Sequence, residues 1–175
     1  MSKIFSILMV FSILFFSFSD SVSAAPFVAD ASASLKSDAV EGQDPRVETL
    51  ENYLESHRSP LAEYSGTFIE VADTYNLDWR LIPAITGVES TFGKRIPKNS
   101  FNAYGWANGE YRFTSWDESS EVVAKTLREK YIDRGAPTIG RIARRYAPPS
   151  STWAWKVKFF MQKIEPLPIY FDLEG

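Results

Sequence analysis

Apolar side chains recur along most of the chain at the spacing of one face of an α-helix, about every three to four residues. The predicted helices cover about residues 45–56, 60–75, 79–90, 116–133, 138–146 and 152–164. Residues that favour helix starts precede several of them, such as the pair Asp44-Pro45 and the capping box from Ser115 to Glu118. The pattern therefore predicts one mainly α-helical domain over residues 44–165.

One stretch lacks helical spacing and is rich in residues that favour turns. It runs from Lys94 to Phe113 and contains a proline, two glycines and several asparagines. Within it, the pair Asn108-Gly109 is typical of a tight hairpin turn. We therefore expect a loop with a small β-hairpin around Ala107 to Glu110.

The ends of the chain differ in composition from this domain. Residues 1–24 have the features of a secretory signal peptide: a positive Lys3, an apolar run and a small-residue cleavage site that ends at Ala24. An uncleaved anchor is the alternative, although the run is short for a membrane span. Residues 25–43 are predicted to be a disordered linker, and residues 166–175 a C-terminal tail. We expect an exported protein, secreted or held in the cell envelope, with no membrane span after cleavage.

Composition excludes several kinds of site. The chain has no cysteine, so it has no disulfide, thiol nucleophile or cysteine metal site, and its single histidine, His57, makes a Ser-His-Asp triad unexpected. Net charge is −3, yet Lys and Arg outnumber Asp and Glu between Lys94 and Lys163. This basic region suits an anionic polymer, and an ordinary solvated surface explains it equally well. No nucleic-acid motif accompanies it, and we expect no metal or cofactor.

The third predicted helix carries one acid at its end, and this acid is the strongest candidate for chemistry. Leu81, Ile85 and the other apolar residues of this helix are expected to be buried, and Glu89 follows them just before a stop at Gly93. A partly buried carboxyl group has a raised pKa and stays protonated closer to neutral pH, as a general acid requires. The alternative is an ordinary surface glutamate at a helix end.

Three motifs in order resemble a known family. Val88-Glu89-Ser90-Thr91-Phe92-Gly93 is similar to the Glu-Ser motif of the lysozyme-like superfamily, and Asn102-Ala103-Tyr104-Gly105-Trp106 resembles the Asn-Leu-Phe-Gly-Ile segment of bacterial glucosaminidase domains. The third motif, Tyr146-Ala147-Pro148-Pro149 with Trp153, Lys156 and Val157, resembles that family's Tyr-Ala-Thr-Asp block and closing helix, with two prolines in place of Thr-Asp. The resemblance covers about Ser59 to Lys163. It implies a lysozyme-like helical fold with a loop or hairpin wall beside a cleft.

The resemblance also implies an activity and a site. The expected enzyme is an endo-β-N-acetylglucosaminidase that cleaves a β-1,4 bond of peptidoglycan, with glycan strands as its partner and a monomer as its state. Glu89 is then the acid that protonates the leaving oxygen, and Tyr146 is expected near it to orient the acid or the sugar's acetamido group. The expected substrate-binding residues are Ser90, Asn102, Tyr104 and Trp106.

Several of these roles have alternatives. Ser90 is equally explained as a helix cap, and Tyr104, Trp106 and Tyr146 as core residues. The glycine at position 105 indicates a close backbone approach or a positive φ.

Glycoside hydrolysis usually needs a second carboxylate. Glu110, on the expected hairpin, is the first candidate; Asp117 and Glu118 are alternatives that helix capping already explains. The acetamido oxygen of the substrate can replace such a group.

Two rival functions remain open. A lytic transglycosylase shares the Glu-Ser motif and uses the sugar's own 6-hydroxyl in place of water, although the Gly-Leu-Met-Gln segment usual in those enzymes is absent. A non-catalytic wall-binding module that kept the fold is the other.

Overall fold

The computed structural model describes residues 44–148 and 150–167, and this part of the chain is mainly helical, as predicted. The helices are α1 Pro45–Ser56, η1 Ala62–Tyr64, α2 Ser65–Thr74, α3 Leu81–Ser90, η2 Trp106–Gly109, α4 Trp116–Thr126, η3 Leu127–Ile132, α5 Ile139–Tyr146 and α6 Trp153–Ile164. Of these, η1 and η2 are 3-10 turns, and η3 is a π-helical continuation of α4.

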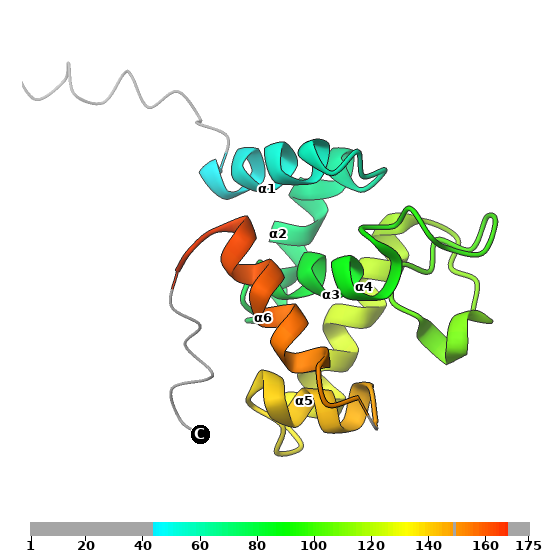
Figure 1. The fold of residues 1–175 in the computed structure, drawn as a ribbon, viewed down its shortest axis with the longest axis vertical. Helices are drawn as coiled ribbons and strands as arrows, with labels where there is room; N and C mark the ends of the chain where they lie inside the picture. Colours follow the sequence, from blue (N-terminus) through cyan, green and yellow to red (C-terminus); the bar gives the residue numbers. More distant parts are fainter. Residues whose placement is uncertain (1–43, 149, 168–175) are drawn as a thin grey trace, which may run out of the picture. The chain divides into compact units, whose positions relative to one another are not determined.

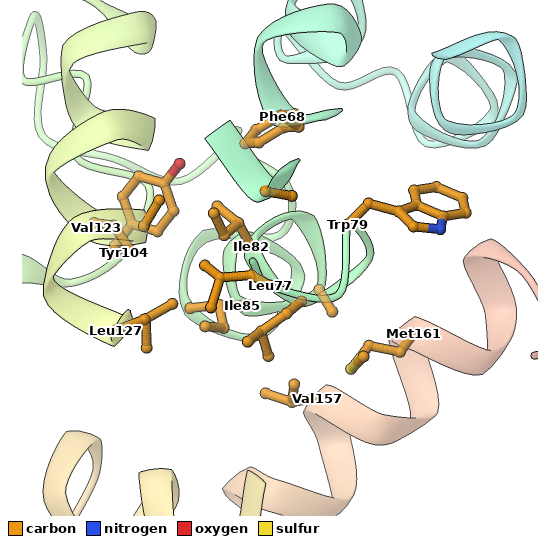
Figure 2. Packing of buried hydrophobic residues seen from close by; sticks show 14 of the residues in the cluster. Phe68, Leu77, Trp79, Ile82, Ile85, Tyr104, Val123, Leu127, Val157 and Met161 are labelled. Carbon is orange, nitrogen blue, oxygen red and sulfur yellow. The ribbon is translucent and has the colours of Figure 1, made fainter. Parts of the chain in front are cut away.

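Helix α3 is the centre of the hydrophobic core. It packs against α2, α4 and α6, and lies between α4 and α6 in Figure 1. Ile82 and Ile85 of α3 are fully buried among side chains from the three neighbouring helices (Figure 2). Burying one such side chain stabilises the fold by about 1.5–3 kcal/mol. The backbone of α3 is therefore held rigidly where it delivers Glu89 to the surface.

The predicted helix starts are confirmed by their caps. The Asp44 carboxylate accepts a hydrogen bond from the Arg46 backbone N–H at 2.9 Å, and Pro45 is the first residue of α1. At α4, the Ser115 hydroxyl accepts from the Glu118 N–H at 3.0 Å. The Glu118 carboxylate in turn accepts from the backbone N–H and the hydroxyl of Thr114, both at 2.6 Å. It therefore bonds the residue before the N-cap, and not the Ser115 N–H as in a strict capping box.

The hairpin prediction is wrong. The described residues contain no strand, and Trp106–Gly109 is a 3-10 turn. Ala107 and Asn108 have φ of 49° and 56°, so the left-handed conformation that Asn-Gly indicated is present. The flanking backbone does not pair, because the Asn102 side-chain amide binds it instead: its Nδ2 donates to the carbonyls of Trp106 and Tyr111 at 2.9 and 3.0 Å.

The residues that follow the last helix, α6, are bound to the rest of the domain. The buried Arg80 side chain donates hydrogen bonds to the carbonyl oxygens of Glu165 and Leu167 at 2.8 and 3.0 Å, which holds the start of the expected tail against the domain. The expected signal peptide, linker and remaining tail, like Pro149, lie outside the described residues. Over the part of the chain that the structure describes, no helix has the length and apolar character needed to cross a membrane.

Candidate active site

Glu89 lies in the last turn of α3 and leaves the core for the surface. The helix is buried from Leu81 to Gly87, Val88 is half-buried, and Glu89 is exposed as a residue. One side of its carboxyl group nevertheless contacts protein. Its Oε1 accepts a hydrogen bond from the indole Nε1 of Trp153 at 2.6 Å. The carboxyl group is therefore fixed in orientation by a side chain of α6.

The other carboxyl oxygen of Glu89 lies against the backbone at Gly105. A Cβ atom at position 105 would lie 3.2 Å from Oε2, and Gly105 has a φ of 65°. Both features that the glycine indicated, a close approach and a positive φ, are confirmed. Only a residue without a side chain accommodates both at low cost.

The backbone is strained immediately after Glu89. Thr91 and Phe92 have φ of 57° and 58°, in the left-handed region that β-branched and bulky residues seldom adopt. The turn is held by a hydrogen bond from the Phe92 N–H to the Thr86 carbonyl at 3.0 Å and by the Phe92 ring, which packs over Gly87. Strained backbone that the surrounding structure over-determines is typical of functional sites.

Trp153 is held by an aromatic neighbour. It is 3% exposed, and its ring stacks on Tyr146 with centroids 5.0 Å apart and planes 30° apart. The Tyr146 hydroxyl donates to the backbone carbonyl of Tyr104 at 2.7 Å. Tyr146 therefore joins the Trp153 side of the site to the segment that contains Gly105.

The surroundings of Glu89 favour its protonated form. Burial raises the pKa of Glu89 above its ordinary value of 4.5, while the hydrogen bond from Trp153 and the charge of Lys156 act in the opposite direction. Burial also raises the pKa of Tyr146 well above its ordinary value, and the nearby negative charge of Glu89 adds to this. Tyr146 is therefore a neutral hydrogen-bond donor at physiological pH.

A cavity of about 250 Å³ lies next to the neighbours of this carboxyl group; Gly105 and Tyr146 line it, and Glu89 itself does not. Its lining residues are Tyr104, Gly105, Trp106, Ala107, Asn108, Tyr131 and Tyr146. Gly105 and Tyr146, both next to Glu89, are shared between the cavity and the acid's surroundings. Its aromatic and amide groups suit the apolar faces and hydroxyls of a sugar ring.

Three of the residues expected to bind substrate are buried. Ser90, 2% exposed, donates to the Ala103 carbonyl at 2.9 Å and accepts from the Gly93 N–H at 2.9 Å, so it caps α3 and ties it to the next loop. Asn102 is 2% exposed and organises the Trp106 turn. Tyr104 is a core residue whose hydroxyl bonds Ser120 at 3.0 Å. Trp106, half-buried, is the expected binding residue whose side chain is partly open to solvent beside the cavity.

The candidate second carboxylates lie elsewhere. Glu110 is exposed at the end of the Trp106 turn and is not among the residues that line the cavity. Asp117 accepts a hydrogen bond from Thr67 at 2.7 Å. Glu118 accepts hydrogen bonds from Thr114 at the start of α4, and these lower the pKa of Glu118. No group of three His, Asp or Glu side chains within residues 44–148 and 150–167 is arranged to hold a metal ion.

Sequence reasoning missed the role of Trp153. The residue belongs to the third family-like motif, but nothing in its local pattern indicates a contact with an acid 64 residues earlier. The available signal was that a buried tryptophan needs an acceptor for its indole N–H, and that Glu89 is the acid of the first of the three motifs. No family model matches the chain, and no curated protein matches it.

Proposed function

We propose that this chain is a peptidoglycan-cleaving glycosidase of the lysozyme-like type, with Glu89 as its general acid. One observation carries the proposal: a glutamate with a raised pKa is held in a fixed orientation beside a cavity lined by aromatic residues. Perturbed carboxyl groups in such settings are typical of glycosidase acids. The three ordered motifs add to this support, since each contributes a residue around the carboxyl group: Glu89, Gly105 and Trp153.

In the proposed reaction, Glu89 transfers its proton to the bridging oxygen between two sugars. The bond from the anomeric carbon to that oxygen breaks, and positive charge develops on the sugar that remains. No second carboxylate is among the groups that shift the pKa of Glu89, and none lines the neighbouring cavity. This favours attack on the anomeric carbon by the carbonyl oxygen of the substrate's own acetamido group. Water then attacks the same carbon and gives its proton to the Glu89 carboxylate, which restores the acid.

The same single acid also favours a second candidate, the lytic transglycosylase. In that reaction the sugar's 6-hydroxyl attacks the anomeric carbon in place of water and returns its proton to Glu89. The product is a 1,6-anhydro sugar. We place the glucosaminidase first because the segment from Asn102 to Trp106 resembles that family.

Product analysis separates these reactions. Purified peptidoglycan would be digested with the chain from Ala25 onward and, in parallel, with Glu89→Gln, and the products would be reduced with borohydride before mass spectrometry. Reduced N-acetylglucosamine ends that the variant does not produce are the expected result. Reduced N-acetylmuramic acid ends would indicate a muramidase, and anhydro ends a transglycosylase. Wall binding by both proteins with no released product would overturn the enzyme proposal in favour of a binding module.

A further inference from the structure

The two carboxyl oxygens of Glu89 have different surroundings. Oε1 accepts from the Trp153 indole N–H at 2.6 Å, and Oε2 lies next to Gly105, which lines the cavity. An indole N–H is a donor only. The carbonyl oxygen of a carboxylic acid is its stronger acceptor, so this hydrogen bond favours the form with Oε1 as the carbonyl oxygen and the proton on Oε2.

We propose that Trp153 is a positioning residue that keeps the transferable proton of Glu89 on Oε2, beside Gly105 and the cavity. This inference rests on the proposed role of Glu89 as an acid and assigns a residue that controls it. Without Trp153, either carboxyl oxygen could carry the proton. A proton on the oxygen that faces away from Gly105 would not be available on the cavity side.

The surroundings of Trp153 support this role, because they form a closed chain of contacts around the acid. Trp153 stacks on Tyr146, and Tyr146 donates to the Tyr104 carbonyl, directly before Gly105. Gly105 in turn lies against Oε2. Both carboxyl oxygens are thus positioned by groups that are connected to one another, and the indole cannot turn away without losing its stacking on Tyr146.

The inference makes a prediction about pH that a purely structural role does not. The charged and titratable groups near Glu89 are Lys156 on α6, which lowers its pKa, and Tyr146 on α5, which stays neutral. The Trp153 hydrogen bond also lowers the pKa of Glu89. Removing it therefore raises that pKa. An enzyme that needs the protonated acid would then keep its activity to higher pH, although with a lower maximal rate.

The test variant is Trp153→Phe, which keeps an aromatic ring beside Tyr146 and removes the N–H. Its matched control is Trp116→Phe, because Trp116 is also buried but lies at the start of α4 and packs against Phe101. Soluble glycan fragments of peptidoglycan are the substrate for the pH dependence of kcat/KM. In parallel, the Glu89 carboxyl carbon is titrated by NMR in substrate-free, ¹³C-glutamate-labelled protein and assigned with Glu89→Gln.

For Trp153→Phe we expect kcat to fall about 10- to 100-fold with little change in KM, as for a displaced reacting group. The alkaline limb of the pH profile and the NMR midpoint of Glu89 should both move to higher pH. Trp116→Phe should move neither. Equal rates in the two variants, with an unmoved midpoint, would overturn the proposal.

A measurement on the unmodified protein covers the case in which Trp153→Phe does not fold. The ¹⁵N–¹H signal of the Trp153 indole should shift with the same midpoint as the Glu89 carboxyl carbon and lose that titration in Glu89→Gln. An indole signal that ignores pH would contradict the inference. If the natural chain releases no glycan product, the proposed function fails, while these titrations still decide whether Trp153 controls Glu89.

Discussion

Replacing Gly105 with alanine tests whether the close approach of backbone to the acid matters for activity. The added Cβ would lie 3.2 Å from Glu89 Oε2, so the carboxyl group must move by roughly a few tenths of an ångström. A φ of 65° adds strain for any L-residue, at about 1–2 kcal/mol. The variant therefore combines a stability cost with a displaced acid, and the two effects need separate measurement.

Gly109→Ala is the matched control, because Gly109 ends the turn that begins after Gly105. Its φ is 86°, so alanine is strained there too, but a Cβ at position 109 would meet nothing within 4 Å. Both variants should lose about 1–2 kcal/mol of stability. Only Gly105→Ala should also lose activity. A misplacement of 1 Å costs about 10²-fold in rate, so a shift of a few tenths of an ångström should cost about tenfold.

The assay is the initial rate at which peptidoglycan releases soluble fragments, measured well below both melting temperatures. Melting curves from circular dichroism supply the stability comparison. Equal rates in the two variants would show that the contact between Gly105 and Glu89 has no consequence for activity. A slow Gly105→Ala variant with an unchanged NMR midpoint of Glu89 and an unchanged Trp153 indole signal would show that the loss of rate does not come from a displaced acid.

Three further predictions concern stability. Because burial raises the pKa of Glu89, the ionised group opposes folding; Glu89→Gln should melt above the natural chain at about pH 8, and the gap should close as the pH falls through that raised pKa, whereas a pH-independent gap would contradict this. Gly87→Ala would put a Cβ 2.6 Å from the buried Phe92 ring, so overpacking of about 1–3 kcal/mol should outweigh the gain in helix propensity of about 1 kcal/mol; a higher urea midpoint would refute this. Arg46 donates to both Asp73 oxygens at 2.8 and 2.7 Å, and Arg46→Ala should cost about 0.2–1 kcal/mol at neutral pH. That cost should vanish in acid, because Arg46 lowers the pKa of Asp73; an unchanged difference at low pH would count against the pair.

Local chemistry explains which parts of the fold were predictable. The caps at Asp44 and Ser115 depend on side chains that bind backbone two or three residues away, so the sequence around each one suffices to identify it. The apolar stripe of α3 likewise predicted burial, because helix geometry alone puts those residues on shared faces. Gly105 was also predictable from its local sequence. A glycine between two large aromatic residues indicates a positive φ or a close approach of the backbone, and both are present.

The errors and omissions come from contacts that local patterns do not contain. The Asn102 amide binds the backbone around Trp106 and prevents strand pairing, although the turn residues themselves favoured a hairpin. Trp153 reaches Glu89 only because α6 packs against α3 in the folded domain. Ser90 shows the same limit: its position beside Glu89 suggested substrate contact, whereas its hydroxyl points into the protein and bonds Ala103.

The most direct test of the central claim compares the rates at which the chain from Ala25, Glu89→Gln and Glu110→Gln form new reducing ends in purified peptidoglycan. Melting curves would accompany each rate to show that the three proteins are folded. If Glu89 is the acid and the substrate supplies its own nucleophile, Glu89→Gln should be inactive and Glu110→Gln should retain most of its activity. Reducing ends formed by Glu89→Gln at the natural rate would contradict the claim, because the reaction would then not depend on this carboxyl group.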